Sequence, residues 1–220
     1  MALPFPSDPG LPGFPGFPGP RVPPAPEHPP GAGGPSTRSI RWAHWYEQEL
    51  GWKVTGGTGG VPLQLPTGQL FDVLELPAAA GRALLEQDVT TGPVALAGTR
   101  VRLWVAAGSA EELDGLLDWL EWSGIALDLT AHGAGGRICA PMPPGLTGGA
   151  TQGAAVWLRP PEPGCEAALP TLAPVGRGGG GLVRLVGAVA SECLRHQLRR
   201  TTRPERPGRP AQAVQPLAFS

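Results

Sequence analysis

Residues 70–106 have the sequence LFDVLELPAAAGRALLEQDVTTGPVALAGTRVRLWVA, and this stretch decides the fold class. Apolar side chains alternate along residues 70–76, which predicts a strand whose two faces differ. One face carries Phe71, Val73 and, at its end, Glu75, and the other carries Asp72, Leu74 and Leu76. Pro77 then favours the first turn of a helix, because the amide that proline lacks is not needed there.

A hairpin and a second helix follow. Short apolar runs at 93–97 and 100–106 flank a Gly-Thr turn, so they predict two antiparallel strands, with Arg100 and Arg102 on one face of the second. Residues 109–122 predict a helix that begins with a capping box of Ser109 and Glu112. Its apolar stripe, spaced to cover a sheet, consists of Leu113, Leu116, Leu117 and Leu120.

Residues 125–145, IALDLTAHGAGGRICAPMPPG, predict a strand, a glycine-rich turn and a second strand. Asp128 and His132 would lie at the mouth of that turn, where a carboxylate beside a glycine-lined opening can hold a metal ion or a phosphate. A plain hairpin with a solvated aspartate remains the alternative. Cys139 falls inside the second strand and is expected to be buried.

Helices and strands at both ends complete the pattern. Residues 39–50 predict a helix capped by Ser39 and ended by Gly51, and residues 154–158 predict a last strand. Together these elements predict an α+β fold in which helices cover a mixed or antiparallel sheet.

Glycine and proline divide the chain, with 34 and 29 residues respectively among 220. This composition predicts a disordered arm at 1–38 and a disordered tail at 201–220, each able to bind a protein partner. The folded domain is expected at 39–159. A linker at 160–181 then leads to a basic amphipathic helix at 182–200. That helix either docks on the domain or contacts phosphate groups or a membrane surface.

The net charge of −1 argues against a uniformly basic surface, although eight arginines gather between residues 177 and 209. The three cysteines form no CxxC pair, so neither a zinc knuckle nor a disulfide framework is indicated. The sequence contains neither a secretory signal pattern nor about 20 consecutive apolar residues, and a cytoplasmic protein is expected.

Three segments, in order, are similar to motifs of one family. They are LFDVLEL at 70–76, AGTRVRLWV at 97–105 and ALDLTAHGAGGRICAPMPPG at 126–145. On these segments the part of the chain from Trp42 to Leu158 resembles the N-terminal domain of bifunctional DNA primase/polymerases, of the archaeo-eukaryotic primase superfamily. The third segment is the most specific, because it combines Asp128, a Gly-Gly pair and a proline-rich end.

The resemblance implies a primase-polymerase-like fold and a nucleotidyltransferase activity in DNA replication that uses divalent metal ions, Mg or Mn. It implies Asp72 and Asp128 as catalytic residues and metal ligands. Arg102, His132 and Arg137 would bind the nucleotide or its phosphates.

Two departures from the family pattern alter this expectation. Leu74 stands where the family has a second acid, and Arg102 stands where it has a histidine. We therefore expect an impaired member that still binds nucleotide or nucleic acid. The alternative is a non-catalytic scaffold or interaction protein that acts through its proline-rich arm and its basic C-terminal helix.

Overall fold

The computed structural model describes residues 36–146, 154–172 and 181–202. The elements in chain order are α1 (Thr37–His44), η1 (Trp45–Glu49), β1 (Gln64–Pro66), β2 (Phe71–Pro77), α2 (Ala78–Leu85), β3 (Val94–Ala97), β4 (Arg100–Ala106), α3 (Ser109–Trp119), β5 (Thr130–His132), β6 (Arg137–Cys139), β7 (Val156–Arg159), η2 (Cys165–Ala168) and α4 (Gly181–Thr201). Nearly all of the expected arm and tail, and part of the expected linker, lie outside the described residues.

The main sheet has five antiparallel strands in the order β5-β2-β4-β3-β7, and β1 pairs with β6 in a separate two-stranded sheet. This arrangement confirms an α+β fold with an antiparallel sheet. In the central pair, Glu75 lies opposite Arg102 and Val73 lies opposite Trp104. On the other side of β2, Val73 also lies opposite His132 of β5. The expected hairpin of β3 and β4 is confirmed, with Ala97 opposite Arg100.

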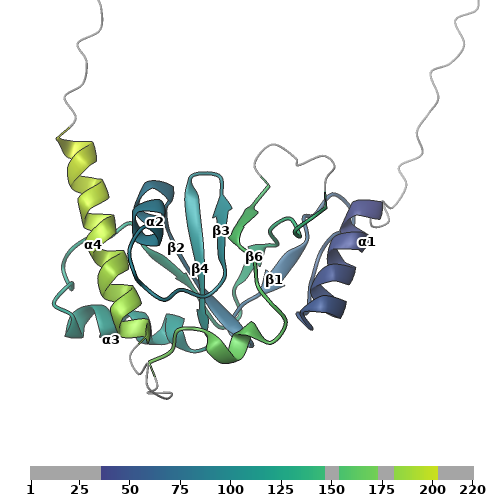
Figure 1. Ribbon diagram of the computed structural model, residues 1–220, viewed down its shortest axis with the longest axis horizontal. Coiled ribbons are helices and arrows are strands. Elements are labelled where there is room, and N and C mark those ends of the chain that lie inside the picture. Colours follow the sequence, from purple (N-terminus) through teal and green to yellow (C-terminus); the bar gives the residue numbers. More distant parts are fainter. Residues whose placement is uncertain (1–35, 147–153, 173–180, 203–220) are drawn as a thin grey trace, which may run out of the picture. The chain divides into compact units, whose positions relative to one another are not determined.

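Three helices cover one face of the main sheet, as Figure 1 shows for α2, α3 and α4. Leu74 and Leu76 of β2 pack there against Leu113 of α3 and Leu185 of α4, all of them buried. The C-terminal helix therefore contributes to the same core as the strands. Seven of its residues are buried, as expected for an amphipathic helix that docks on the domain.

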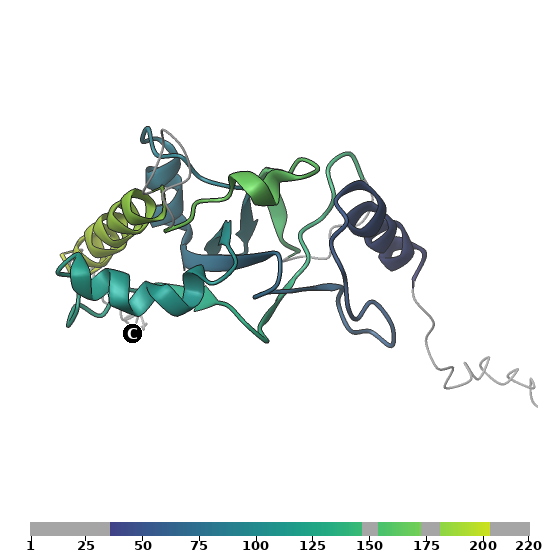
Figure 2. The same ribbon diagram turned by 90° about the horizontal axis from the view of Figure 1, so that it is seen from below.

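The opposite face of the sheet carries an aromatic core. It is built from Tyr46, Trp52, Phe71, Trp104 and Ile138, with Trp157 packed against it. The helix α1, with its continuation η1, lies on this side of the structure together with β1 and β6 (Figure 2). The alternation predicted for β2 is thus correct, because its two faces contribute to two separate cores.

Two predicted helix starts are wrong. The first helix begins at Thr37, and Ser36 is its N-cap, with a side chain that accepts a hydrogen bond from the amide of Ser39. In α3 the N-cap position belongs to Gly108, in a left-handed conformation, and Ser109 is already helical and buried. Ser109 and Glu112 therefore form no capping box, and the amides of this helix end need another acceptor.

The strand pair predicted around Asp128 does not form a hairpin. β5 joins the main sheet beside β2, whereas β6 joins β1, and Asp128 itself precedes β5. The glycine-rich turn between them packs on the turn before β2. Thr67 donates through Oγ1 to the carbonyl of Gly133 at 2.7 Å, and a Cβ on Gly68 would lie 2.2 Å from the Cα of Ala134. Within the described part of the chain, no helix is long and apolar enough to cross a membrane.

Candidate functional site

Asp72 lies on β2 with its side chain on the helix-covered face, and it is fully buried. Its Oδ2 accepts a hydrogen bond of 2.9 Å from the main-chain amide of Ala110, in the first turn of α3. Its Oδ1 has no hydrogen-bond partner among the described residues. A negative group is favoured at a helix N-terminus, so Asp72 caps α3 from a neighbouring strand.

The surroundings of Asp72 oppose its ionisation. Burial raises the pKa of Asp72 above its ordinary value of 3.8, the Ala110 amide opposes this rise, and the charge of Glu111 adds to it. Desolvation of the charged form is thus the dominant influence on this carboxylate.

The other face of β2 carries a half-buried group of charged residues, which we call the Glu75 cluster. Its members are Glu75, Arg100, Arg102, Asp128 and His132. The Nε of Arg102 donates to Oε2 of Glu75 at 2.7 Å, and the Nε of Arg100 lies 3.3 Å from Oε1. The Nε2 of His132 lies 3.6 Å from Oε2 of the same carboxylate. Glu75 therefore holds two arginines on one sheet face, with His132 beside them and without a hydrogen-bond partner for its Nε2 among the described residues.

Arg100 connects Glu75 to Asp128. Its Nη1 donates to Oδ1 of Asp128 at 2.6 Å, and its Nη2 donates to the main-chain carbonyl of Glu75 at 3.0 Å. The side chain of Asp128 is 45% exposed, whereas those of the two arginines are 23% and 15% exposed. Asp128 is thus the outer, solvated end of the cluster, and its charge is already opposed by a guanidinium.

The charges of the cluster nearly cancel. Burial alone would raise the pKa of Glu75, but the hydrogen bond and charge of Arg102, together with the charges of His132 and Arg100, lower it below its ordinary value. Two guanidinium groups thus face two carboxylates, so the formal charges of these four side chains cancel.

Arg137 and Cys139 lie on the same face of β6, because they flank Ile138, which points into the aromatic core. Both are exposed, so the prediction of a buried Cys139 is wrong: Ile138 occupies the buried position of this three-residue strand. The carbonyl of Cys139 accepts a hydrogen bond of 3.3 Å from Nη1 of Arg102. This bond links β6 to the Glu75 cluster.

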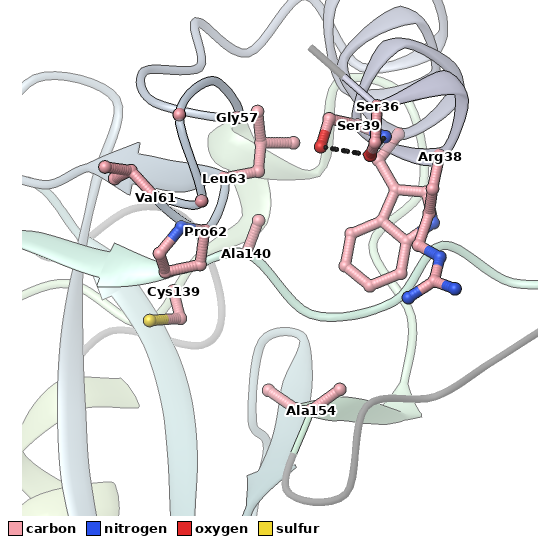
Figure 3. A pocket seen from close by; sticks show the side chains of 14 residues that line it. Ser36, Arg38, Ser39, Gly57, Val61, Pro62, Leu63, Cys139, Ala140 and Ala154 are labelled. Atoms are coloured by element: carbon pink, nitrogen blue, oxygen red, sulfur yellow. Dashed lines mark hydrogen bonds between the residues drawn. The ribbon is translucent and has the colours of Figure 1, made fainter. Parts of the chain in front are cut away.

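A cavity of about 490 Å³ lies beside β6 (Figure 3). It is bounded by the start of α1, by residues of the glycine-rich segment 57–63, by Cys139 and Ala140, and by Ala154 and Ala155. Its lining is mostly apolar, with Ser36, Ser39 and Arg38 at the helix end. Cys139 thus lines the cavity and, through its carbonyl, also bonds Arg102 of the Glu75 cluster.

The residues expected to hold a metal ion do not fit a shared site. Asp72 points toward the helix-covered face and bonds Ala110, whereas Asp128 lies beside Arg100, which pairs in register with Pro77 at the far end of β2. Five residues of strand, roughly 16 Å, separate positions 72 and 77. No group of three or more potential metal ligands occurs among the described residues. The structure does not bring the two aspartates together.

Of the five residues predicted for the site, the structure brings Arg102, His132 and Asp128 into one cluster and places Arg137 on the adjoining strand β6. Sequence reasoning missed Glu75 and Arg100 as the residues that connect them. One signal for Glu75 was present: it continues the apolar face of Phe71 and Val73, where a charged residue needs partners.

Searches for related proteins found no matching family model, curated protein or solved structure.

Proposed function

We propose that this chain is a primase-polymerase-like domain that binds a nucleoside triphosphate or a nucleic-acid strand through phosphate groups and has lost polymerase activity. The observation that carries this proposal is the convergence of Arg102 and His132 on Glu75, next to Arg137 on β6. The resemblance of the motifs suggests that the ligand is a nucleotide or a nucleic acid. The arginines supply groups that can bind its phosphates. Binding in the cytoplasm, where nucleoside triphosphates are abundant, is part of the proposal.

Guanidinium groups suit this role because they present several donors in a fixed plane that matches phosphate oxygens. Arg102 uses its Nε for Glu75 and its Nη1 for Cys139, which fixes the plane of the group before any ligand arrives. No described residue accepts from its Nη2.

Polymerase chemistry in the family that the motifs resemble is expected to need carboxylates that share metal ions. Here the two retained aspartates have other partners, Ala110 and Arg100, and position 74 carries a buried leucine. We therefore assign these residues no step in a metal-dependent reaction. The proposed activity is binding alone.

Thermal unfolding with and without ATP tests the proposal. At 100 times its Kd, a ligand that binds the folded state stabilises it by about 2.7 kcal/mol, which is a shift of several degrees. We expect this shift for the wild type, also in the presence of EDTA. Arg137→Ala should strongly reduce the ATP-dependent shift, because Arg137 is a proposed phosphate contact. The variant should still fold, since Arg137 is exposed and its removal spares the core.

Arg82→Ala is the matched control, since Arg82 is an exposed arginine on α2, which covers the opposite face of the sheet. It should leave the shift unchanged. An ATP effect that is absent from the wild type, or equally reduced in both variants, would reject the phosphate site. The interaction-protein alternative would then be examined with a chain that ends at Thr202, because removing α4 would also remove part of the core.

A further inference from the structure

The cavity beside α1 has the size and the lining of a small-molecule site. Its volume of about 490 Å³ falls within the roughly 300–1,000 Å³ of such sites. Trp42, Val61, Leu63 and Ala140 give it apolar walls. Figure 3 shows Ser36 and Ser39 at one end, joined by a hydrogen bond of 3.0 Å, with Cys139 on the side toward the sheets.

The walls suit a flat, partly polar ring better than an aliphatic chain. An indole offers a face on which an aromatic heterocycle can stack, and such contacts tolerate any base. The two serine hydroxyls can meet the polar edge of a heterocycle or the hydroxyls of a sugar. Hydrophobic walls with a few polar groups at one end are typical of cofactor and nucleotide pockets.

One residue of the cavity wall also contacts the proposed phosphate site. Cys139 lines the cavity, the carbonyl of Cys139 bonds Arg102, and Arg137 lies two residues away on the same face of β6, about 7 Å along the strand. A ligand that fills the cavity therefore needs only a short extension to reach both arginines.

We propose that the cavity holds the base and sugar of a nucleoside triphosphate whose phosphates contact Arg102 and Arg137. This inference rests on the proposed function and adds the position of the nucleoside. The pocket would be built by the start of α1, by residues of the segment 57–63, by Cys139 and Ala140, and by Ala154 and Ala155, none of which is a member of the Glu75 cluster.

Cys139 is a built-in reporter for this site. It is the exposed cysteine among the three, whereas burial raises the pKa of Cys165 to about 11 and that of Cys193 to about 12. Because the thiolate is the reactive form, maleimide should label Cys139 first. The labelling rate of the Cys139 peptide is measured by mass spectrometry without ligand and with saturating ATP, adenosine or tripolyphosphate.

We expect ATP to slow labelling at least tenfold, adenosine at high concentration to slow it as well, and tripolyphosphate to slow it much less. Equal protection by tripolyphosphate and ATP would mean that phosphate contact alone covers Cys139, which overturns the inference. Thermal stabilisation by ATP with no change in labelling would also overturn it, while leaving the proposed function intact. Absence of both effects would reject the two proposals together.

A cavity-filling variant gives an independent readout. Val61 lines the cavity and is 51% exposed, so Val61→Trp should fill the space without disturbing the core. We expect it to weaken ATP binding about tenfold and to leave tripolyphosphate binding unchanged. Leu158→Trp, at a residue of β7 that is 43% exposed and does not line the cavity, is the matched control and should change neither. Unchanged ATP affinity in Val61→Trp would contradict the assignment.

Discussion

The carboxylate of Asp72 on β2 accepts a hydrogen bond of 2.9 Å from the amide of Ala110 at the start of α3. This bond joins a central strand to the helix that covers it, in a position where Gly108 offers no capping side chain. Asp72 thus has a structural role that needs no metal ion. A strand residue replaces the local cap that the sequence predicts at Ser109.

Asp72→Ala should destabilise the fold by about 1–3 kcal/mol, because the Ala110 amide then loses its acceptor. Asp72→Asn should cost less, since its amide oxygen can still accept this bond and carries no charge to bury. Urea denaturation at neutral pH checks the order of the three proteins. An alanine variant as stable as the asparagine variant would rule out the capping role.

The same carboxylate predicts a pH dependence. The pKa of Asp72 is raised in the folded state, so the folded protein holds this proton more tightly than the unfolded chain does. Its contribution to stability is therefore full below the unfolded pKa and decreases as pH rises through the folded pKa. Relative to Asp72→Asn, the wild type should gain stability as the pH falls from 7 toward 4. Parallel stability curves for the two proteins would contradict this.

Glu75→Gln should separate stability from binding. The pKa of Glu75 is lowered in the folded state, so its stabilising effect exists above the unfolded pKa and is lost as the pH falls through the folded value. At pH 7 the variant should lose about 1–3 kcal/mol, because Arg100 and Arg102 lose a charged acceptor. The same change leaves excess positive charge, so ATP should bind about threefold to tenfold more tightly. Weaker ATP binding by a folded Glu75→Gln protein would argue against an anion site.

Gly68→Ala should be strongly destabilising. Gly68 has a φ of 87°, and an added Cβ would lie 2.2 Å from the Cα of Ala134, so both the backbone and the neighbouring loop would have to move. Gly98→Ala is the control, because Gly98 also has a positive φ, of 58°, but no atom lies within 4 Å of the added Cβ. Thermal unfolding should show a much larger loss of stability for Gly68→Ala than for Gly98→Ala. Similar losses of stability would mean that the turn at Gly68 does not pack against the turn that contains Ala134.

Leu185→Ala in α4 should cost about 2–5 kcal/mol, since this leucine is fully buried against the strands. Leu198→Ala on the same helix should cost less than about 0.5 kcal/mol, because Leu198 is 54% exposed. Calorimetry of both variants distinguishes a helix that belongs to the core from a tethered basic segment. Equal and small effects would support the tethered segment.

Sequence periodicity predicted the elements whose pattern is local. The faces of β2, the hairpin of β3 and β4 and the buried stripe of α4 follow from alternation and helical spacing. The partners of β5 and β6 did not follow, because a three-residue strand carries too little pattern to select its neighbour. The cap of α3 was missed for a related reason: its acceptor, Asp72, lies 38 residues away in sequence.

The sequence predicted several residues of the site but not the contacts that connect them. Arg102, His132 and Asp128 do meet, but they meet around Glu75 and Arg100. That organisation depends on the register that sets Glu75 opposite Arg102, and no motif in the sequence specifies the register. The separation of Asp72 from Asp128 has the same origin, because Asp128 pairs with Arg100, which the register sets opposite Pro77 at the other end of β2.

Calorimetric titration of ATP into the wild type and Arg137→Ala, in EDTA and at low and high salt, tests the phosphate site most directly. We expect measurable binding by the wild type that weakens with salt, about tenfold or more weaker binding by Arg137→Ala, and unchanged binding by Arg82→Ala. ATP affinity that is indifferent to salt and equal in all three proteins would contradict this expectation.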